Sequence, residues 1–400
     1  METLNIRFGK DSSWIVPQDK HIASIRAPQP QLNDLAAAVD SALSNPLEFP
    51  SLDQELVPGD QLVLVVDPQL PALVEALSAI VHWFCQQGTP ASNIQVVLAA
   101  EGQWDAAQLA KVIEQRTHIS IAVTQHSLDD NENIAYVAAN EASEAIYLNR
   151  RVVDADVVIP ITCARPQTSL DYFGSFSLFP LLSNRATRGQ FYSLPKLEKP
   201  AIHGQLQSWA DQAAWWVGVL VGIQIIPAAD DGIAMVKAGQ LQPLEQAAQQ
   251  MMSDVWGSTG NSSSDLVISI LDGPASSQSW LSIARLIFVA LRFVTPRGTI
   301  VIASELSDPI GKGLARLRDP HQMPEVISKK LASDDSDDAL AAAVILNAIS
   351  SNHVYLISKL RGDSVESLGL GAITAADQLT RLVAQHQSCT VIEAAQHRVV

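Results

Sequence analysis

The stretch from residue 59 to residue 100 constrains the fold most, because it has the pattern of a complete strand–helix–strand unit. Residues 61–66 form a continuous apolar strand that ends at Asp67 and Pro68. Apolar residues then recur at helical spacing from 73 to 84, and residues 94–99 form a second apolar strand. Strands that are apolar on both faces and joined by a helix are typical of a parallel sheet covered on both sides, with a right-handed crossover.

The same alternation continues to the C-terminus and predicts a second unit of the same kind. A polar segment rich in Gly and Ser, residues 257–264, is the best candidate for a linker between the two. After it, apolar strands expected at 265–271, 299–304, 353–357 and 390–392 alternate with helices. The sequence therefore predicts an α/β fold with two doubly wound parallel-sheet domains, residues 1–260 and 261–400, that meet at an interdomain cleft.

Composition excludes several classes of partner. The 400 residues carry 26 Lys and Arg against 42 Asp and Glu, a formal net charge of −16, so nucleic-acid phosphates would be repelled. The three cysteines, Cys85, Cys163 and Cys389, are far apart and predict no disulfide and no cysteine-based zinc site. The most apolar stretch, 213–229, is interrupted by Gly and Pro, and residues 1–11 lack a secretory pattern. We expect a cytoplasmic protein that binds neither nucleic acid nor membrane; its oligomeric state is not predicted.

No standard catalytic or metal-binding motif is present. The chain has no P-loop, no dinucleotide-binding glycine pattern, no nucleophile elbow and no H-E-x-x-H. The acidic run at 333–338 predicts a solvated loop with a helix N-cap, because it lacks the spacing and the final Glu of a calcium loop. No metal site is therefore expected.

Ligands of open parallel sheets bind at the carboxyl ends of the strands. Five such ends are expected, at residues 67–69, 101–103, 126–130, 162–167 and 272–273. The segment from 162 to 200 is irregular and rich in Pro and aromatic residues, which is typical of a functional loop. A cleft lined by Arg165, Arg185 and Arg285 would favour a carboxylate. A cleft lined by aromatic side chains would favour an apolar ligand or a collapsed site; the candidates are Trp104, Phe173, Phe176, Phe179 and Tyr192.

Several segments resemble the nickel-pincer lactate racemase family, whose members racemise 2-hydroxy acids. The best-matching stretches are residues 59–67 and 146–159, followed by 216–239 and 297–303. The resemblance covers the chain from about Gly59 to the C-terminus and consists mainly of strands and turns. It therefore implies a shared two-domain fold more strongly than shared chemistry.

The resemblance also shows which chemical groups differ. The family ends its first strand in Asp-x-Thr-Arg-Pro, which helps to hold a phosphorylated, nickel-carrying cofactor, whereas here Asp67 and Pro71 match and the Thr and Arg do not. This leaves Asp67 and Gln69 as candidate cofactor contacts. The family's next strand ends in a run with a catalytic histidine, where this chain has Glu101-Gly102-Gln103. Glu101 is the candidate substitute for that base.

The covalent tether and the metal ligand differ as well. The resemblance places Phe176 about where the family has its cofactor-tethering lysine, and Tyr192 near the nickel-binding histidine. Residues 166–195 contain neither Lys nor His. We therefore expect no cofactor and no nickel. Asp171, in the same window, is a further candidate base, as are Asp129 and Asp130.

The family's substrate-contacting lysine aligns with Arg285, which could hold a carboxylate bidentately. The substrate site expected around it includes Asp272, Gly273 and Gln278. The favoured hypothesis is a divergent member of the family without nickel-pincer racemase activity that binds a small carboxylate in the cleft. The alternatives are an isomerase acting on a 2-hydroxy acid with a rebuilt active site, and a protein-interaction scaffold.

Overall fold

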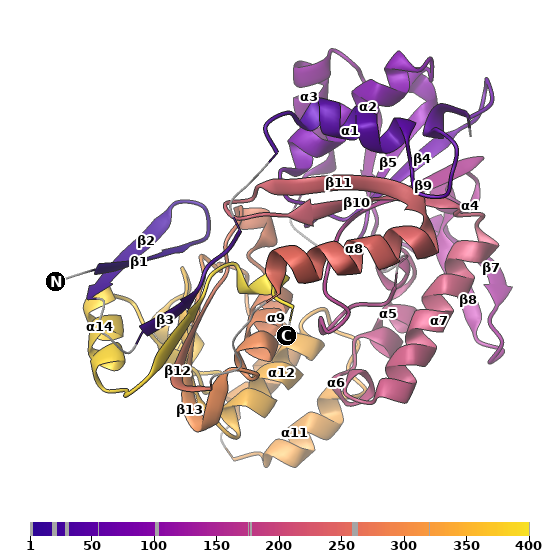
Figure 1. Cartoon of the computed structure of the whole chain (residues 1–400). Helices are drawn as coiled ribbons and strands as arrows, with labels where there is room; N and C mark the ends of the chain where they lie inside the picture. The colour runs from indigo at the N-terminus through magenta and orange to yellow at the C-terminus, as the bar shows by residue number, and fades with distance from the viewer. Residues whose placement is uncertain are drawn as a thin grey trace.

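A computed structural model describes residues 3–17, 22–28, 32–54, 56–100, 104–174, 176, 178–257, 263–319 and 321–399. In these residues two six-stranded sheets are flanked by helices (Figure 1). The first sheet has the order β11 (Ile233–Gln240), β10 (Val221–Pro227), β9 (Val157–Cys163), β4 (Leu62–Val66), β5 (Ile94–Leu98), β6 (Ala122–Gln125). The second has the order β15 (Gly371–Ala372), β14 (His353–Ile357), β13 (Val294–Ala303), β12 (Ser264–Ile270), β16 (Cys389–Ile392), β3 (Ile22–Ile25). The predicted α/β fold class is confirmed.

Fourteen α-helices accompany these sheets in the described part of the chain. The longer ones are α1 (Leu35–Ser44), α2 (Leu73–Gln86), α3 (Ala106–Thr117), α7 (Pro200–Trp216), α8 (Leu241–Trp256), α9 (Trp280–Ala290), α11 (Pro324–Leu331), α12 (Ala339–Ile349) and α14 (Ala376–Ala384). The shorter ones are α4 (Arg150–Val153), α5 (Arg185–Phe191), α6 (Leu194–Leu197), α10 (Lys312–Ala315) and α13 (Gly362–Glu366).

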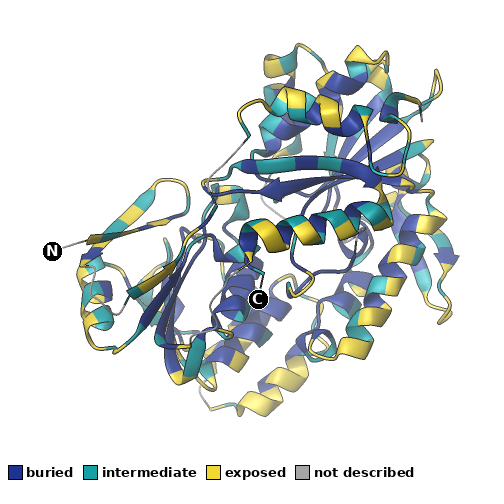
Figure 2. Cartoon of the chain, in the orientation of Figure 1, coloured by how far each residue is buried: buried dark blue, intermediate teal, exposed yellow. Residues whose placement is uncertain are grey.

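The strand β4 shows why its sequence is apolar on both faces. All five of its residues are buried. Leu62, Leu64 and Val66 pack in one core with side chains of α1, α2 and α3, whereas Val63 and Val65 belong to the core on the opposite face. This alternation is the two-residue period of a strand covered on both sides. Figure 2 shows the central strands of both sheets buried and the outer faces of the surrounding helices exposed.

Each sheet reverses its winding direction once. In the first sheet the chain runs outward from β4 to β5 and β6, and then returns to add β9 on the other side of β4. In the second sheet it runs outward from β12 to β15, and then returns to add β16 beside β12. Such reversals are the topological switch points, and crevices form there at the carboxyl ends of the strands.

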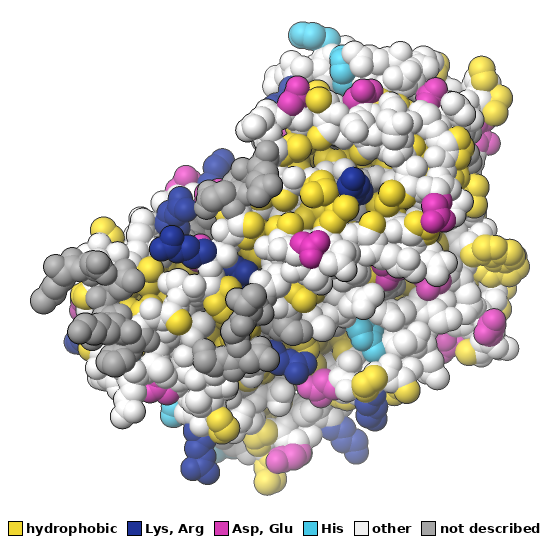
Figure 3. All heavy atoms as spheres, viewed as in Figure 1, with side chains coloured by type: hydrophobic (Ala, Val, Ile, Leu, Met, Phe, Trp, Pro, Cys, Tyr) yellow, Lys and Arg dark blue, Asp and Glu magenta, His cyan; other side chains and the backbone are white. Residues whose placement is uncertain are grey.

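Several elements were not predicted. The edge strand β11 runs antiparallel to β10, and Figure 3 shows hydrophobic side chains gathered over this part of the first sheet. A hairpin lies outside the large sheets, in which β7 (Ile134–Ala139) pairs with β8 (Ala145–Asn149). A second hairpin, β1 (Thr3–Phe8) with β2 (Ser12–Pro17), packs on the second sheet. These additions cover sheet edges and faces.

The chain begins in the second sheet. The strand β3, which falls within the predicted domain 1–260, pairs in parallel with β16 near the C-terminus. Its segment therefore lies with the C-terminal half of the fold. The boundary predicted near residue 260 remains a prediction, and residues 258–262 of the expected linker lie outside the described residues.

Two expectations about composition can be compared with the structure. All three cysteines are free thiols, as predicted. Among the described residues, no helix is both long and apolar enough to cross a membrane.

Candidate functional site

Two cavities lie where carboxyl ends of strands from both halves of the chain approach each other. The smaller has a volume of about 40 Å³, and the larger has a volume of about 810 Å³. The smaller is lined by Gln69, Pro71, Cys163, Arg165, Asp231, Leu271, Asp272, Gly273, Ser277, Ser282, Arg285, Gln396 and His397. We call it the junction cavity.

The junction cavity lies at the switch points of both sheets. Gln69 and Arg165 follow β4 and β9, the two strands between which the first sheet reverses. Asp272 and Gln396 follow β12 and β16, the corresponding pair in the second sheet. The two places where an open α/β sheet forms a crevice therefore coincide in one cavity.

The structure brings together seven of the predicted site residues, whereas Asp129 and Arg185 line the larger cavity. Gln69, Asp272, Gly273 and Arg285 line the junction cavity. Asp67, Asp171 and Gln278 form hydrogen bonds or ion pairs with lining residues. Glu101, proposed as a base, lies outside the described residues.

Arg285 forms a buried ion pair with Asp171. The Arg285 Nε donates to Asp171 Oδ1 at 3.0 Å, and Nη2 donates to Oδ2, so the contact is bidentate. The two side chains are only 6% and 2% exposed. Burial alone would raise the pKa of Asp171, but the Arg285 guanidinium outweighs that effect and holds the pKa below its usual value. Arg285 Nη1 also donates to Gln69 Oε1.

Arg165 forms the second ion pair, with Asp67. Its Nη2 lies 2.8 Å from Oδ2 of Asp67, which is completely buried at the end of β4. The same carboxylate accepts backbone hydrogen bonds from Gln69 at 2.9 Å and Cys163 at 3.3 Å. Asp67 thus holds together the loops that follow β4 and β9, while Arg165 lines the cavity.

Gln278 joins the loops of the second sheet. Its Nε2 donates to the carbonyl oxygens of Asp272 and Gly273, at 3.3 Å each, and its Oε1 accepts from the Glu305 backbone at 2.9 Å. The side chain is 2% exposed. Gln278 therefore positions the loop after β12, and does not itself line the cavity.

Two carboxyl groups in the junction cavity have unusual pKa values. Burial raises the pKa of Asp231 to about 7, and nearby Asp272 adds to the effect. Burial also raises the pKa of Asp272 to about 6. Groups with perturbed pKa values in a cleft are typical of functional sites. Asp272 was predicted as a site residue, whereas Asp231 was noted only in a segment that resembles the family.

The C-terminal turn contributes residues that were not predicted. Gln396 and His397 follow β16 and line the cavity. Burial, together with the charges of Arg165 and Arg285, lowers the pKa of His397 to about 3, so its ring is neutral at pH 7. No sequence motif marks this turn. Its position at the cavity could be predicted only from the strand order, in which β16 lies beside β12.

Strained backbone surrounds the junction cavity. Ala72, Asp230, Asp231 and Ala394 have positive φ angles of 44°, 57°, 58° and 44°. Each is a cavity-lining residue or lies within two positions of one. Such conformations are unfavourable for residues other than glycine and cluster at ligand-binding and active sites.

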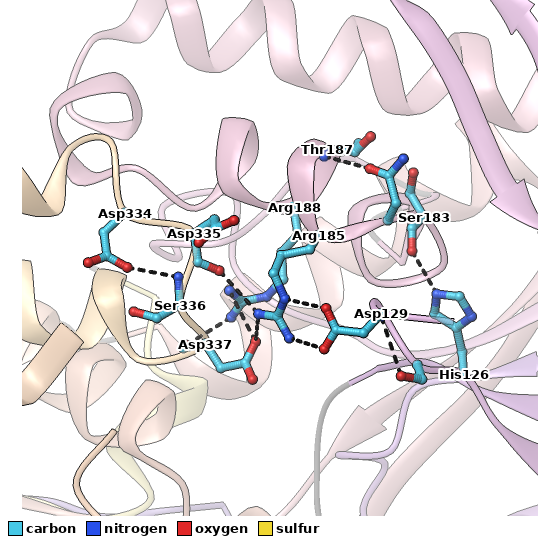
Figure 4. Close-up of polar contacts among 12 residues, drawn as sticks. His126, Asp129, Ser183, Arg185, Thr187, Arg188, Asp334, Asp335, Ser336 and Asp337 are labelled. Atoms are coloured by element: carbon cyan, nitrogen blue, oxygen red, sulfur yellow. Dashed lines mark hydrogen bonds and ion pairs between the residues drawn. The ribbon is translucent and has the colours of Figure 1, made fainter. Parts of the chain in front are cut away.

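The larger cavity has a network of ion pairs at its rim. Figure 4 shows Arg185 of α5 between Asp129 and Asp337. Arg185 Nε and Nη2 each donate to Asp129 at 2.6 Å, and Nη1 donates to Asp337 at 2.9 Å. Nη2 of Arg188 donates to the Asp337 carbonyl at 2.9 Å. Because Asp337 belongs to the C-terminal half, the two arginines connect the halves.

The acidic run at 333–338 is an ordered loop beside this cavity. Asp334 pairs with Arg316, and the Asp338 carboxylate accepts from the backbone of Gly313 and Leu314 at 2.9 and 3.1 Å. Asp338 is also the N-cap residue of α12, although its side chain caps α10. Within the described ranges, no cluster of three or more His, Cys, Asp or Glu side chains could hold a metal ion.

The sequence and the fold of this chain were compared with those of known proteins. Residues 8–177 match the family model of the lactate racemase N-terminal domain. Over these residues the chain is therefore similar to the N-terminal domain of lactate racemases. The lactate racemase apoprotein from Thermoanaerobacterium thermosaccharolyticum has a similar fold, with a TM-score of 0.78 at 15% identity over 100% of both chains. A protein from Thermotoga maritima has a TM-score of 0.68 at 12% identity over 94% of this chain and 99% of its own. No curated protein sequence matches the chain.

The residues that the resemblance places at the tether and metal-ligand positions do not fit a nickel-pincer cofactor. Phe176, expected about at the tether position, is completely buried, and Tyr192, expected near the metal-ligand position, is 3% exposed. Phe173 packs edge-to-face on Phe191, and Phe179 does the same, so aromatic rings fill this region. A phenyl ring offers no amine for a covalent tether. The aromatic residues thus form core, and charged residues line the junction cavity.

The described candidate bases are held in their ionised forms. The pKa of Asp129 is lowered by Arg185, and that of Asp130 by a hydrogen bond from Asn133. The pKa of Asp171 is lowered by Arg285 despite burial. A base with a low pKa abstracts protons poorly near neutral pH. For these three residues of the lactate racemase fold, a structural role accounts for the observed contacts.

Proposed function

We propose that this protein binds a small carboxylate in the junction cavity and lacks nickel-pincer racemase activity. The observation that carries the proposal is the position of Arg165 and Arg285. One guanidinium from each half of the chain lines a single cavity where the switch points of both sheets meet. Guanidinium groups bind carboxylates through geometrically matched, charge-assisted hydrogen bonds.

The size of the cavity limits the ligand. A volume of about 40 Å³ accommodates about three water molecules, since each needs roughly 10–15 Å³ of this kind of volume. A two- or three-carbon acid is the ligand class of that size. Arg165 Nη2 lies 2.8 Å from Asp67, and a guanidinium has five N–H donors, more than one carboxylate contact uses.

Two features support the absence of nickel-pincer chemistry. The resemblance places Phe176 about at the tether position, and the candidate bases that the structure describes are paired with cations or amide donors. The expected result is an intact mass equal to that of the polypeptide, with no stoichiometric nickel by elemental analysis. A cofactor-sized adduct on any lysine would contradict this part of the proposal.

Binding is tested by titrating acetate, glycolate and lactate into the full-length protein by calorimetry. Arg165→Gln should weaken binding about tenfold to hundredfold, because one charge-assisted hydrogen bond contributes roughly 1.5–3 kcal/mol. Arg361→Gln is the matched control, since Arg361 is 84% exposed and pairs only with exposed Asp363 in the described structure. Equal affinities in all three proteins would remove Arg165 from the site.

A further inference from the structure

The residues that line the junction cavity include a group of hydrogen-bond donors and a group of acceptors, which we call the donor wall and the acceptor wall. Arg165 and Arg285 belong to the donor wall, together with Gln69. Because Gln69 Oε1 accepts from Arg285, its amide nitrogen points elsewhere, and this buried Nε2 atom has no hydrogen-bond partner among the described residues. The donor wall therefore has an unused amide donor beside two guanidinium groups.

The acceptor wall consists of Asp231, Asp272 and Gln396. The Gln396 Nε2 donates to Asp272 Oδ1, which leaves its buried Oε1 without a partner in the part of the chain that the structure describes. The other oxygen of Asp272 accepts from the Asp230 backbone at 3.1 Å. This wall therefore has two carboxyl groups beside an unused amide acceptor.

The charges on the two walls are not balanced in the same way. Each guanidinium is already matched by a carboxylate, Arg165 by Asp67 and Arg285 by Asp171. Asp231 and Asp272 form no ion pair with any described residue, and hydrogen bonds from backbone and amide groups are their observed contacts. A ligand with a positive charge would compensate the acceptor wall, whereas a hydroxyl group would not.

We infer that the natural ligand is a small α-amino acid, with its carboxylate toward Arg165 and Arg285 and its ammonium group toward Asp231 and Asp272. The inference rests on the proposed function, because it assigns the second functional group of the same ligand. The cavity volume of about 40 Å³ favours the smallest members of the class.

The protonation states of the lining residues agree with this polarity. Burial raises the pKa values of Asp231 and Asp272 more than their hydrogen bonds, and the charge of Lys10 near Asp231, lower them. An ammonium group at hydrogen-bonding distance would add the missing compensation. His397 is neutral at pH 7 because burial lowers its pKa, so it adds no positive charge that would repel the ligand.

The test compares glycine with glycolate, which differ only in the ammonium and hydroxyl groups. Calorimetric titration of the full-length protein at pH 7.5 should show glycine binding at least about tenfold more tightly. In Asp231→Asn this preference should fall to about threefold or less. Asp363→Asn, at an exposed position outside both cavities, should retain the preference.

The possible outcomes separate the two proposals. Tighter binding of glycolate, or equal binding of the two, would overturn the amino-acid assignment and leave carboxylate binding intact. Failure of both compounds to bind wild-type protein would overturn both proposals. An unchanged preference in Asp231→Asn, with the same circular dichroism spectrum as wild type, would remove Asp231 from recognition of the ammonium group. The comparison in wild-type protein needs no variant, so misfolding cannot obscure it.

Discussion

The two cavities between the halves of the molecule use the same kind of contact in different surroundings. At the junction cavity, Arg285 and Asp171 are 6% and 2% exposed. At the rim of the larger cavity, Arg185 is 27% exposed, and its partners Asp129 and Asp337 are 65% and 70% exposed. Removing one partner of a buried ion pair lowers the free energy of unfolding strongly, because the remaining charge is not solvated by water. Exposed ion pairs contribute little to this free energy and are screened by salt. The junction cavity is therefore held rigidly, and the larger cavity is closed by contacts that exchange easily with water.

The largest effect is expected at the buried pair. Arg285→Met should lower the free energy of unfolding by about 3–5 kcal/mol, because Asp171 would remain buried without its partner. Urea denaturation followed by circular dichroism measures this. Adding Asp171→Leu should recover most of the loss, since a buried pair can be replaced by apolar side chains at little cost. A single variant that loses less than about 1 kcal/mol would show that Asp171 reaches solvent.

The uncompensated carboxyl groups predict a distinctive dependence on pH. The folded-state pKa of Asp231 is about 7, above the ordinary value of 3.8 for this group, so its contribution to stability is present below pH 4 and is lost as the pH rises toward 7. Asp272, with a pKa of about 6, acts in the same direction. Asp231→Asn removes one of these titrations.

Thermal unfolding between pH 4 and pH 8 tests this dependence. The stability of Asp231→Asn relative to wild type should increase as the pH rises, because only the wild type must ionise a buried carboxyl group. Ala72, whose backbone donates to Asp231, and the nearby Asp272, Glu75 and Lys10 are unchanged in the variant. A constant difference across this range would show that Asp231 titrates normally.

The rim of the larger cavity should respond weakly and should depend on salt. Asp337→Asn removes a carboxylate that lies 2.9 Å from Arg185 and 3.8 Å from Arg188. The expected loss is at most about 1 kcal/mol, in the range of exposed pairs. It should shrink further in 1 M NaCl, where screening acts over about 3 Å. A loss that is independent of salt would indicate that this pair is effectively buried.

The smallest change in the free energy of unfolding is expected at an exposed ion pair, which serves as the reference for the rim. Arg381 and Asp377 form an i,i+4 pair on α14, and both are 70% exposed. Arg381→Ala should change the free energy of unfolding by about 0.3–0.5 kcal/mol. If this variant and Asp337→Asn behave alike at low and high salt, the rim contributes no more than an ordinary surface pair.

The sequence was informative wherever local pattern decides structure. The apolar strands at β4 and β5 and the helix between them were predicted because burial on both faces leaves an unbroken apolar run. The strand-end rule then identified Asp67, Gln69 and Asp272 as neighbours of a cleft. The structure places all three at or beside the junction cavity. Their role in binding remains a proposal.

The sequence was uninformative wherever a residue's position depends on distant strands. Nothing near Gln396 or His397 marks them as cavity residues, and nothing near Ile22–Ile25 shows that β3 pairs with β16. The partner of Arg285 could not be predicted either, because helical spacing does not reveal which loop packs against a helix. Asp171 reaches it from a segment without regular structure.

By itself, the sequence determined the layered α/β fold and the acidic, cysteine-poor character of the chain, because these follow from local periodicity and composition. Its family resemblance also marked the replacement of the tether lysine by Phe176. Only the tertiary structure decided that two ion pairs are buried, that Asp231 and Asp272 line the same cavity as their arginines, and that the switch points of both sheets coincide. These features depend on strand order and on desolvation. Both are properties of contacts between segments far apart in the chain, and no local pattern encodes them.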